Sequence, residues 1–207
     1  MGNGAEASPA YATASLQDET ESLASRAAHG DADAQYEYAT ELHDRGDTKG
    51  AVAWLEKSAK QGSAKARLQL GLLYLKGAGV SRNFNQAHKW LEAAANNGDP
   101  IAMHNLGVLY SGNEGRKPDY VRATELFRRA AERGVVDSQF NLGLAYQDGL
   151  GVEKDLIQAY AWFCMAASRG DAKAAQKRKE ISKFLGREEL LEAKTLANSL
   201  KLATPAN

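Results

Sequence analysis

A 36-residue periodicity constrains the fold of this chain more than any other feature of its sequence. The word LG-x-x-Y occurs three times, at residues 70–74, 106–110 and 142–146, and the residues around it recur at the same interval. Repeats of roughly 20–50 residues are typical of solenoids, in which each unit buries its apolar face against the next. Five further columns keep this interval: Gly62, Gly98, Gly134 and Gly170; Trp54, Trp90, Leu126 and Trp162; Ala51, Ala87, Ala123 and Ala159; Ala59, Ala95, Ala131 and Ala167; and Asp47, Asn83, Asp119 and Asp155.

Capping residues divide each unit into two helices. The Asx column stands before an apolar-periodic stretch, where its side-chain oxygen can accept hydrogen bonds from the free N–H groups of a first helical turn. The glycine column follows the last alanines and fits a left-handed residue just past a helix end. A second set of caps follows four of these turns, at Asp31, Ser63, Asp99 and Asp171, with Pro100 placed at a first helical position. Val135 breaks the set, and Asp137 is expected to cap in its place.

Glycines inside the first helix of a unit point to close packing between helices. Gly71, Gly107 and Gly143 each lie within LG-x-x-Y, where glycine costs roughly 1 kcal/mol relative to alanine. A cost repeated at every unit suggests a contact that admits no side chain. The first unit is four residues shorter and carries Ala39 at the glycine position and Leu42 at the tyrosine position.

The pattern predicts the following organisation. Residues 1–14 are expected to be a disordered linker or the trimmed end of one, and residues 203–207 a disordered tail. A capping helix over 15–29, with Ser15 as its cap, precedes four repeats at 30–61, 62–97, 98–133 and 134–169. Two C-terminal capping helices span 170–202, because the end of a solenoid faces water and departs from the repeat.

Composition excludes several classes of function. The net charge is zero, which gives no reason to expect a nucleic-acid partner. Neither a transmembrane helix nor a signal peptide is visible. The four histidines (His29, His43, His88 and His104) have no metal-ligand spacing, and Cys164 is expected to be a buried packing residue. We therefore expect no catalytic residue, no metal and no cofactor, and a chain that is not an enzyme.

The repeat resembles a known family. The stretch "AKARLQLGLLYLKGAGVSRNFNQAHKWLEAAANNG" and the two units after it resemble the Sel1-like repeat, a relative of the tetratricopeptide repeat, over residues 30 to about 185. The resemblance implies an all-α fold, a right-handed α/α superhelical solenoid with a concave groove. It also implies an adaptor that holds other proteins; many bacterial members are exported. A cysteine-rich secreted branch of the family is disfavoured by the single cysteine.

Residues 137–197 carry a narrower resemblance. They are similar to the C-terminal periplasmic region of bacterial polar-localisation proteins of the PodJ type, which are membrane-anchored and recruit other proteins to one cell pole. This implies a periplasmic domain whose native chain is anchored in the inner membrane upstream of this segment. A cytoplasmic location is the alternative.

A polar position before each LG-x-x-Y is the candidate for partner binding. Stacked first helices would align Glu37, Gln69, Asn105 and Asn141 along the groove, flanked by His104 and by apolar walls at Leu72, Val108, Phe140 and Leu144. In related tetratricopeptide adaptors an asparagine at this position holds the backbone of an extended peptide, and an amide both donates and accepts. The alternative is that Asn105 and Asn141 only tie neighbouring repeats together.

Three functions remain open from the sequence. The preferred one is a scaffold that binds a protein or peptide segment and acts in cell polarity. The second is a cell-wall module that binds peptidoglycan, and the third is a periplasmic regulator of a sensor kinase.

Overall fold

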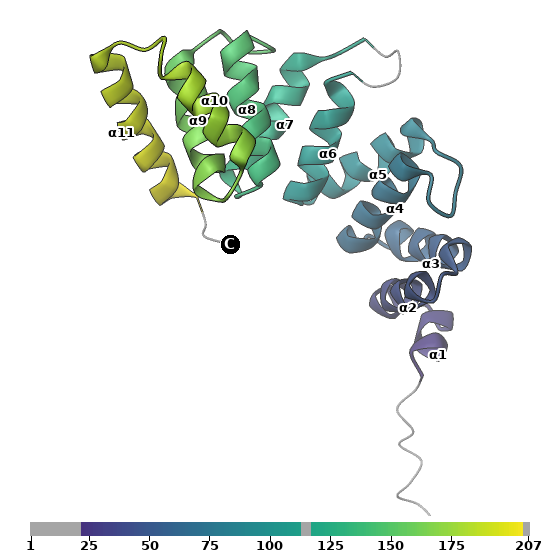
Figure 1. Ribbon diagram of the computed structural model, residues 1–207. Coiled ribbons are helices and arrows are strands. Elements are labelled where there is room, and N and C mark those ends of the chain that lie inside the picture. The colour runs from purple at the N-terminus through teal and green to yellow at the C-terminus, as the bar shows by residue number, and fades with distance from the viewer. Residues whose placement is uncertain (1–21, 113–116, 205–207) are drawn as a thin grey trace, which may run out of the picture.

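The protein is an array of helices stacked along a curved axis. The computed structural model describes residues 22–112 and 117–204, and within these ranges all regular secondary structure is helical. Figure 1 shows the helices following one another in chain order along an arc, with α1 and α11 at opposite ends. The helices are α1 Leu23–Ala28, α2 Ala32–Asp44, α3 Thr48–Lys60, α4 Ala64–Lys76, α5 Phe84–Asn96, α6 Pro100–Tyr110, α7 Tyr120–Glu132, α8 Val136–Asp148, α9 Leu156–Ser168, α10 Ala172–Ile181 and α11 Arg187–Ala203.

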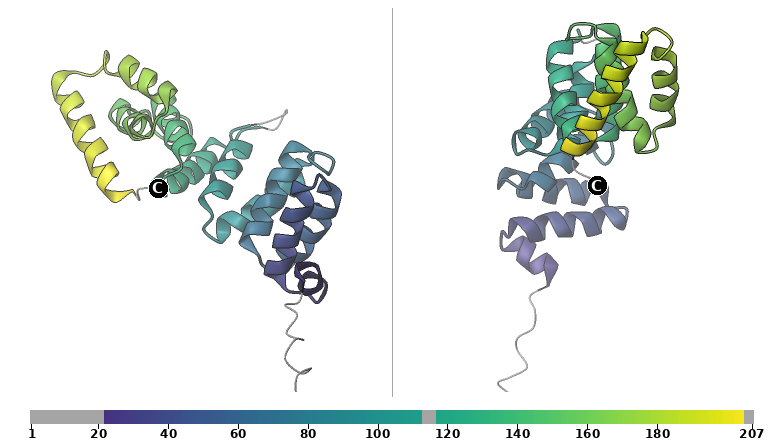
Figure 2. Two further views of the ribbon diagram at one scale, coloured as in Figure 1. Left: turned by 60° about the horizontal axis from the view of Figure 1, so that its bottom comes forward. Right: turned by 90° about the vertical axis from the view of Figure 1, so that its left-hand side faces the viewer.

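The helices pack as successive pairs, which is the unit that the sequence predicts. α2 packs with α3, α4 with α5, α6 with α7 and α8 with α9, and each pair then packs on the next through its second helix. The two further views show the same progressive stacking (Figure 2). The predicted α/α solenoid is confirmed, with α2, α4, α6 and α8 as the first helices and α3, α5, α7 and α9 as the second.

Both sets of predicted helix caps are present. The Asx column accepts hydrogen bonds from the first turns of α3, α5, α7 and α9, and the second set caps α2, α4, α6 and α10. Gly98 and its repeat equivalents have positive φ, as the turn after each second helix requires. The prediction for Asp137 was wrong. Val135 is the N-cap of α8 and makes no side-chain hydrogen bond there. Asp137 lies inside the first turn, where its negative charge interacts favourably with the positive end of the helix dipole.

The glycines inside the first helices lie at close helix contacts. A Cβ atom added at Gly71 would lie 2.6 Å from the Leu91 side chain. At Gly107 it would lie 2.8 Å from the ring of Phe127, and at Gly143 2.7 Å from the ring of Phe163. In these three pairs a large side chain of the second helix thus packs directly on the backbone of the first, so the repeated glycine allows the pair to close.

The C-terminal end departs from the repeat. α10 and α11 do not pack together as a pair; both pack against α9. The small side chains of Ala193 and Ala197 are buried and let α11 approach α9 closely. In Figure 2, left, α11 extends away from α10 at the end of the array.

At the N-terminus, α1 begins at Leu23 with Ser22 as its cap. Ser15, the expected cap, and residues 15–21 of the helix expected over 15–29 lie outside the described residues. At the other end α11 continues to Ala203, and Thr204 remains buried with its hydroxyl donating to the Leu200 carbonyl.

Candidate functional site

The nine predicted groove residues all lie on first helices of the pairs. Eight of them are half-buried and Glu37 is exposed, so none is sequestered in the core. Glu37 is on α2, Gln69 and Leu72 are on α4, His104, Asn105 and Val108 are on α6, and Phe140, Asn141 and Leu144 are on α8.

The structure brings five of these residues together where α6 meets α8. A hollow of about 290 Å³ is lined by Val108, Asn141 and Leu144 together with the ring of Phe127. A second hollow, of about 530 Å³, is lined by His104, Phe140 and Asn141. Asn141 borders both. Glu37, Gln69 and Leu72 line neither of these two hollows, which use the predicted positions of the third and fourth repeats.

Three residues from the C-terminal capping region also line the second hollow. They are Asp171, Ala172 and Lys173, at the start of α10. With Asp137 they place two carboxylates and one ammonium around an otherwise apolar and amide surface. Sequence reasoning missed this contribution because α10 lacks LG-x-x-Y, but the cap at Asp171 already placed its start next to the fourth repeat.

The two asparagines differ in how their amides are used. Asn105 donates through Nδ2 to the carbonyl of Ile101, one turn earlier in its own helix, at 2.8 Å. The side-chain amide of Asn141 has no hydrogen-bond partner among the residues that the structure describes. Neither amide bonds to a neighbouring repeat, so the alternative role of a tie between repeats lacks the hydrogen bond that it requires.

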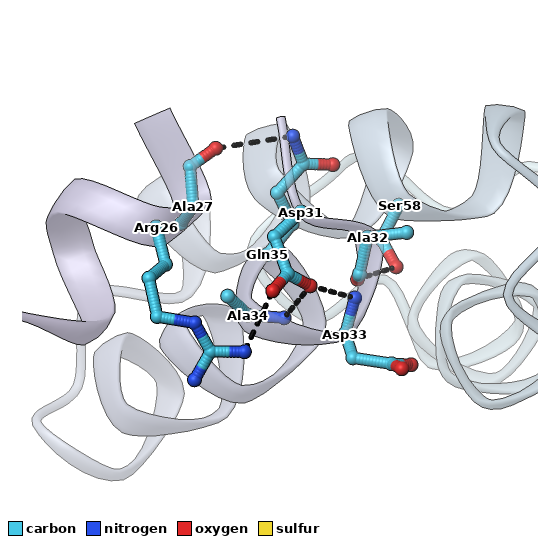
Figure 3. Close-up of polar contacts among 8 residues, drawn as sticks. All are labelled: Arg26, Ala27, Asp31, Ala32, Asp33, Ala34, Gln35 and Ser58. Carbon is cyan, nitrogen blue, oxygen red and sulfur yellow. Dashed lines mark hydrogen bonds and ion pairs between the residues drawn. The ribbon is translucent and has the colours of Figure 1, made fainter. Parts of the chain in front are cut away.

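Ties between repeats are made from a different column, two positions before the asparagines. Gln35 reaches from α2 to the carbonyl of Ala27 in α1, whereas the nearby Ser58 on α3 joins the two helices of the first repeat by donating to the carbonyl of Ala32 (Figure 3). The equivalents of Gln35 do the same at two further junctions. Arg67 donates to the Ala59 carbonyl at 3.2 Å, and Gln139 to the Ala131 carbonyl at 3.1 Å. The fourth member of this column, Met103, has no donor.

His104 makes a polar contact between α6 and α8. Its Nδ1 lies 2.8 Å from the hydroxyl oxygen of Ser138, which is fully buried, and its ring lies 5.9 Å from that of Phe127. Burial lowers the pKa of His104, because desolvation disfavours the imidazolium; the nearby Asp137 acts in the opposite direction. The folded state therefore favours the neutral form of the His104 ring.

This pKa difference predicts a loss of stability in mildly acidic solution. A histidine whose pKa is lowered in the folded state binds more protons when the chain is unfolded. Its contribution to the free energy of unfolding is therefore largest above the unfolded pKa of about 6.5. It is lost as pH falls from there toward the folded pKa. Urea unfolding between pH 8 and pH 5 should show this decline, and His104→Gln should reduce it. His43→Gln, on an exposed position of α2, is the control; an equal change in both variants would contradict the assignment.

The described residues show few features of a metal site, a reactive thiol or a membrane span. No group of three or more His, Cys, Asp or Glu side chains there is arranged to hold a metal ion. Cys164 is half-buried rather than fully buried as expected. Burial raises the pKa of its thiol, against the opposing effect of Arg178, so the less reactive protonated form is favoured. Among the helices of residues 22–112 and 117–204, none has the length and apolar character of a membrane span.

Comparison with known proteins agrees with this architecture. The family model of the Sel1 repeat matches residues 32–63, 64–99, 100–135 and 136–171. A comparison with curated proteins finds no match. Among solved structures, the chain is similar to a Sel1 repeat protein from Oxalobacter formigenes, with 31% identity over 77% of this chain and 47% of that one, at a TM-score of 0.67.

A second similar structure is a protective antigen present in uropathogenic Escherichia coli strains, which displays the Sel1-like repeat fold. It is 30% identical over 86% of this chain and 47% of its own, at a TM-score of 0.53. The chain thus spans about half the length of either solved protein. Both likenesses agree with a right-handed α/α superhelical solenoid. Sel1 repeat proteins generally mediate protein–protein interaction and are generally non-catalytic. With four matched repeats over most of its length, the chain belongs to the Sel1 repeat family.

Proposed function

We propose that this chain is a non-enzymatic scaffold that binds an extended segment of a partner protein where α6 meets α8. The observation that carries the proposal is the amide of Asn141, which borders both hollows and has no partner among the described residues. An amide in that position can both donate to and accept from a peptide backbone. Val108, Phe140 and Leu144 offer apolar surface on either side of it.

Phe140 and Asn141 are expected to contribute different amounts to the binding free energy. Phe140 is half-buried, with its ring 5.6 Å from that of Phe163, so one part of the ring is held by the core while the other lines the hollow. Aromatic anchors of this kind carry a large share of binding energy in protein interfaces. A single backbone hydrogen bond from Asn141 contributes less.

Calorimetric titration of a purified partner tests the site. The partner is first identified by cross-linking from position 144, with an exposed position on α5, Lys89, as the negative control. Phe140→Ala should then weaken binding by about 2 kcal/mol or more, and Asn141→Ala by about 1 kcal/mol, about fivefold in Kd. Asn105→Ala is the matched control, because its amide already bonds to Ile101, and it should bind nearly as the wild type does.

Melting curves separate binding from folding. If Phe140→Ala and Asn141→Ala melt like the wild type and bind with full affinity, the partner uses another surface. Sedimentation with purified peptidoglycan distinguishes a cell-wall module, and capture of a sensor kinase by the same cross-link would favour the regulatory alternative.

The biological setting is a further part of the proposal. We propose that the chain works in the periplasm as part of a polar-localisation factor anchored in the membrane upstream. Support comes from the resemblance of residues 137–197 to the periplasmic region of PodJ-type proteins. In bacteria, the native protein fused to a fluorescent protein that matures in the periplasm should concentrate at one pole. A uniform signal along the envelope would exclude this role while leaving the scaffold function open.

A further inference from the structure

A second surface, separate from the α6–α8 site, lies at the C-terminal end of the array. α11 packs on α9 through Ala193 and Ala197, and this leaves the flank of α11 that carries Glu188, Leu191 and Glu192 uncovered. Figure 1 places α11 at the outer end of the molecule, beyond α9 and α10.

Two hollows meet on this surface. One, of about 640 Å³, runs between the start of α9 and the exposed flank of α11, and its apolar residues are Ile157, Leu191 and Leu196. The other, of about 680 Å³, lies on the side of the α10–α11 loop and includes Phe184. Asp155 and Ile157 line both, so the two hollows form one continuous surface. We call it the C-terminal groove.

Large apolar side chains on this surface are unusually exposed. Phe184 is 75% exposed and Leu191 is 67% exposed, whereas Leu91, Phe127 and Phe163 on the second helices are buried. Apolar side chains gathered on a hollowed surface mark interaction sites more often than scattered ones do. Burial of these two side chains by a partner would supply the apolar part of an interface.

The charge around the groove is strongly acidic. Its lining includes five carboxylates, from Glu153, Asp155, Glu188, Glu189 and Glu192, and one cationic side chain, Lys154. Two of these carboxylates have local roles: Asp155 caps α9, and Glu189 accepts from the Gly186 N–H at 2.7 Å. The other three carboxylates have no ion-pair or hydrogen-bond partner within the described part of the chain. An apolar groove with an acidic rim selects a partner that is apolar on one face and basic at its edges.

The length of the groove indicates the form of the partner. From Glu188 to Ser199 the lining follows α11 for about three turns, or roughly 16 Å at 1.5 Å per residue. We propose that the C-terminal groove binds a basic amphipathic helix of a partner protein. Its apolar stripe lies on Ile157, Leu191 and Leu196, and its lysines and arginines face Glu188 and Glu192.

Fluorescence anisotropy with a defined probe tests this proposal on the full chain. The probe is a labelled amphipathic peptide of leucine and lysine, about 14 residues long, and the same peptide with glutamate for lysine is its charge control. The wild type should bind the lysine peptide and not the glutamate peptide. Two changes in the groove should each weaken binding about tenfold or more: the pair Glu188→Lys and Glu192→Lys, and the single change Leu191→Asp.

A variant with the same change in net charge distinguishes binding in the C-terminal groove from nonspecific electrostatic attraction of the peptide. Glu125→Lys with Glu132→Lys alters two exposed carboxylates on α7 and should leave peptide affinity near that of the wild type. Equal weakening by this pair, or full binding by Leu191→Asp, would overturn the proposal. Light scattering is run alongside: a dimer of the wild-type chain that Leu191→Asp dissociates would show that a second copy occupies the groove and would also overturn it. Circular dichroism confirms that each variant is folded.

Discussion

Replacing Phe163 with alanine should lower the free energy of unfolding by about 3–5 kcal/mol. Phe163 is fully buried on α9, with its ring on the backbone of Gly143 in α8 and 5.6 Å from the ring of Phe140. Its loss removes apolar surface from both helices of the fourth repeat and leaves a cavity that the glycine, having no side chain, cannot fill. Urea unfolding followed by circular dichroism measures the change.

Phe184→Ala is the matched control for this substitution. The same side chain is removed at a position that is 75% exposed, between α10 and α11, so the change should be within about 0.5 kcal/mol. Similar losses in the two variants would contradict the placement of Phe163 in the core.

Replacing Gly107 with leucine should destabilise the protein by about 1–3 kcal/mol, even though leucine is the better helix former. A Cβ atom at this position would lie 2.8 Å from the ring of Phe127 and 3.3 Å from the carbonyl oxygen of Ala123. The second of these is backbone, so α6 and α7 would have to move apart. Thermal unfolding with calorimetry gives the change in midpoint.

A glycine in open surroundings provides the comparison for Gly107. Gly186 has φ of −66°, and a Cβ atom there would have only the carboxylate of Glu189 nearby, at 3.5 Å. Gly186→Ala should therefore change stability little. An unaltered midpoint for Gly107→Leu would show that the glycine does not set the spacing of the pair.

The parts of the fold that follow from local chemistry could be predicted from the sequence. An Asp or Asn before an apolar stretch caps the same helix in every unit. In the second to fourth repeats, the glycine within LG-x-x-Y meets a large residue at one equivalent position of the second helix. Because these contacts lie within one pair or at its turn, a single unit carries all the necessary information. Val135 was the exception, since a helix can begin there without a side-chain cap.

What could not be predicted depends on contacts between units. Nothing in the spacing of α11 indicates that it packs on α9 rather than on α10; that depends on the competition between two buried surfaces. The ties from Gln35, Arg67 and Gln139 were also missed, because the column mixes two amides, a guanidinium and Met103 and so does not look like a repeated position. The candidate groove was predicted as four equal positions, whereas the two hollows that Asn141 borders lie where α8 faces α6 and the start of α10.

Met103 gives the array a mechanical asymmetry. At the junctions with Gln35, Arg67 and Gln139, a directional hydrogen bond fixes the angle between one unit and the next. Between α5 and α6 the equivalent position carries the buried thioether of Met103, whose flexible side chain can keep its packing while the angle changes. The side-chain hydrogen bond of this junction lies elsewhere, between His88 Nε2 and the Tyr110 hydroxyl at 2.8 Å. A load applied to the two ends of the molecule should therefore meet less resistance at Met103 than at the equivalent positions of the other three junctions. Bending about the His88–Tyr110 contact would let the C-terminal surfaces swing relative to the N-terminal repeats.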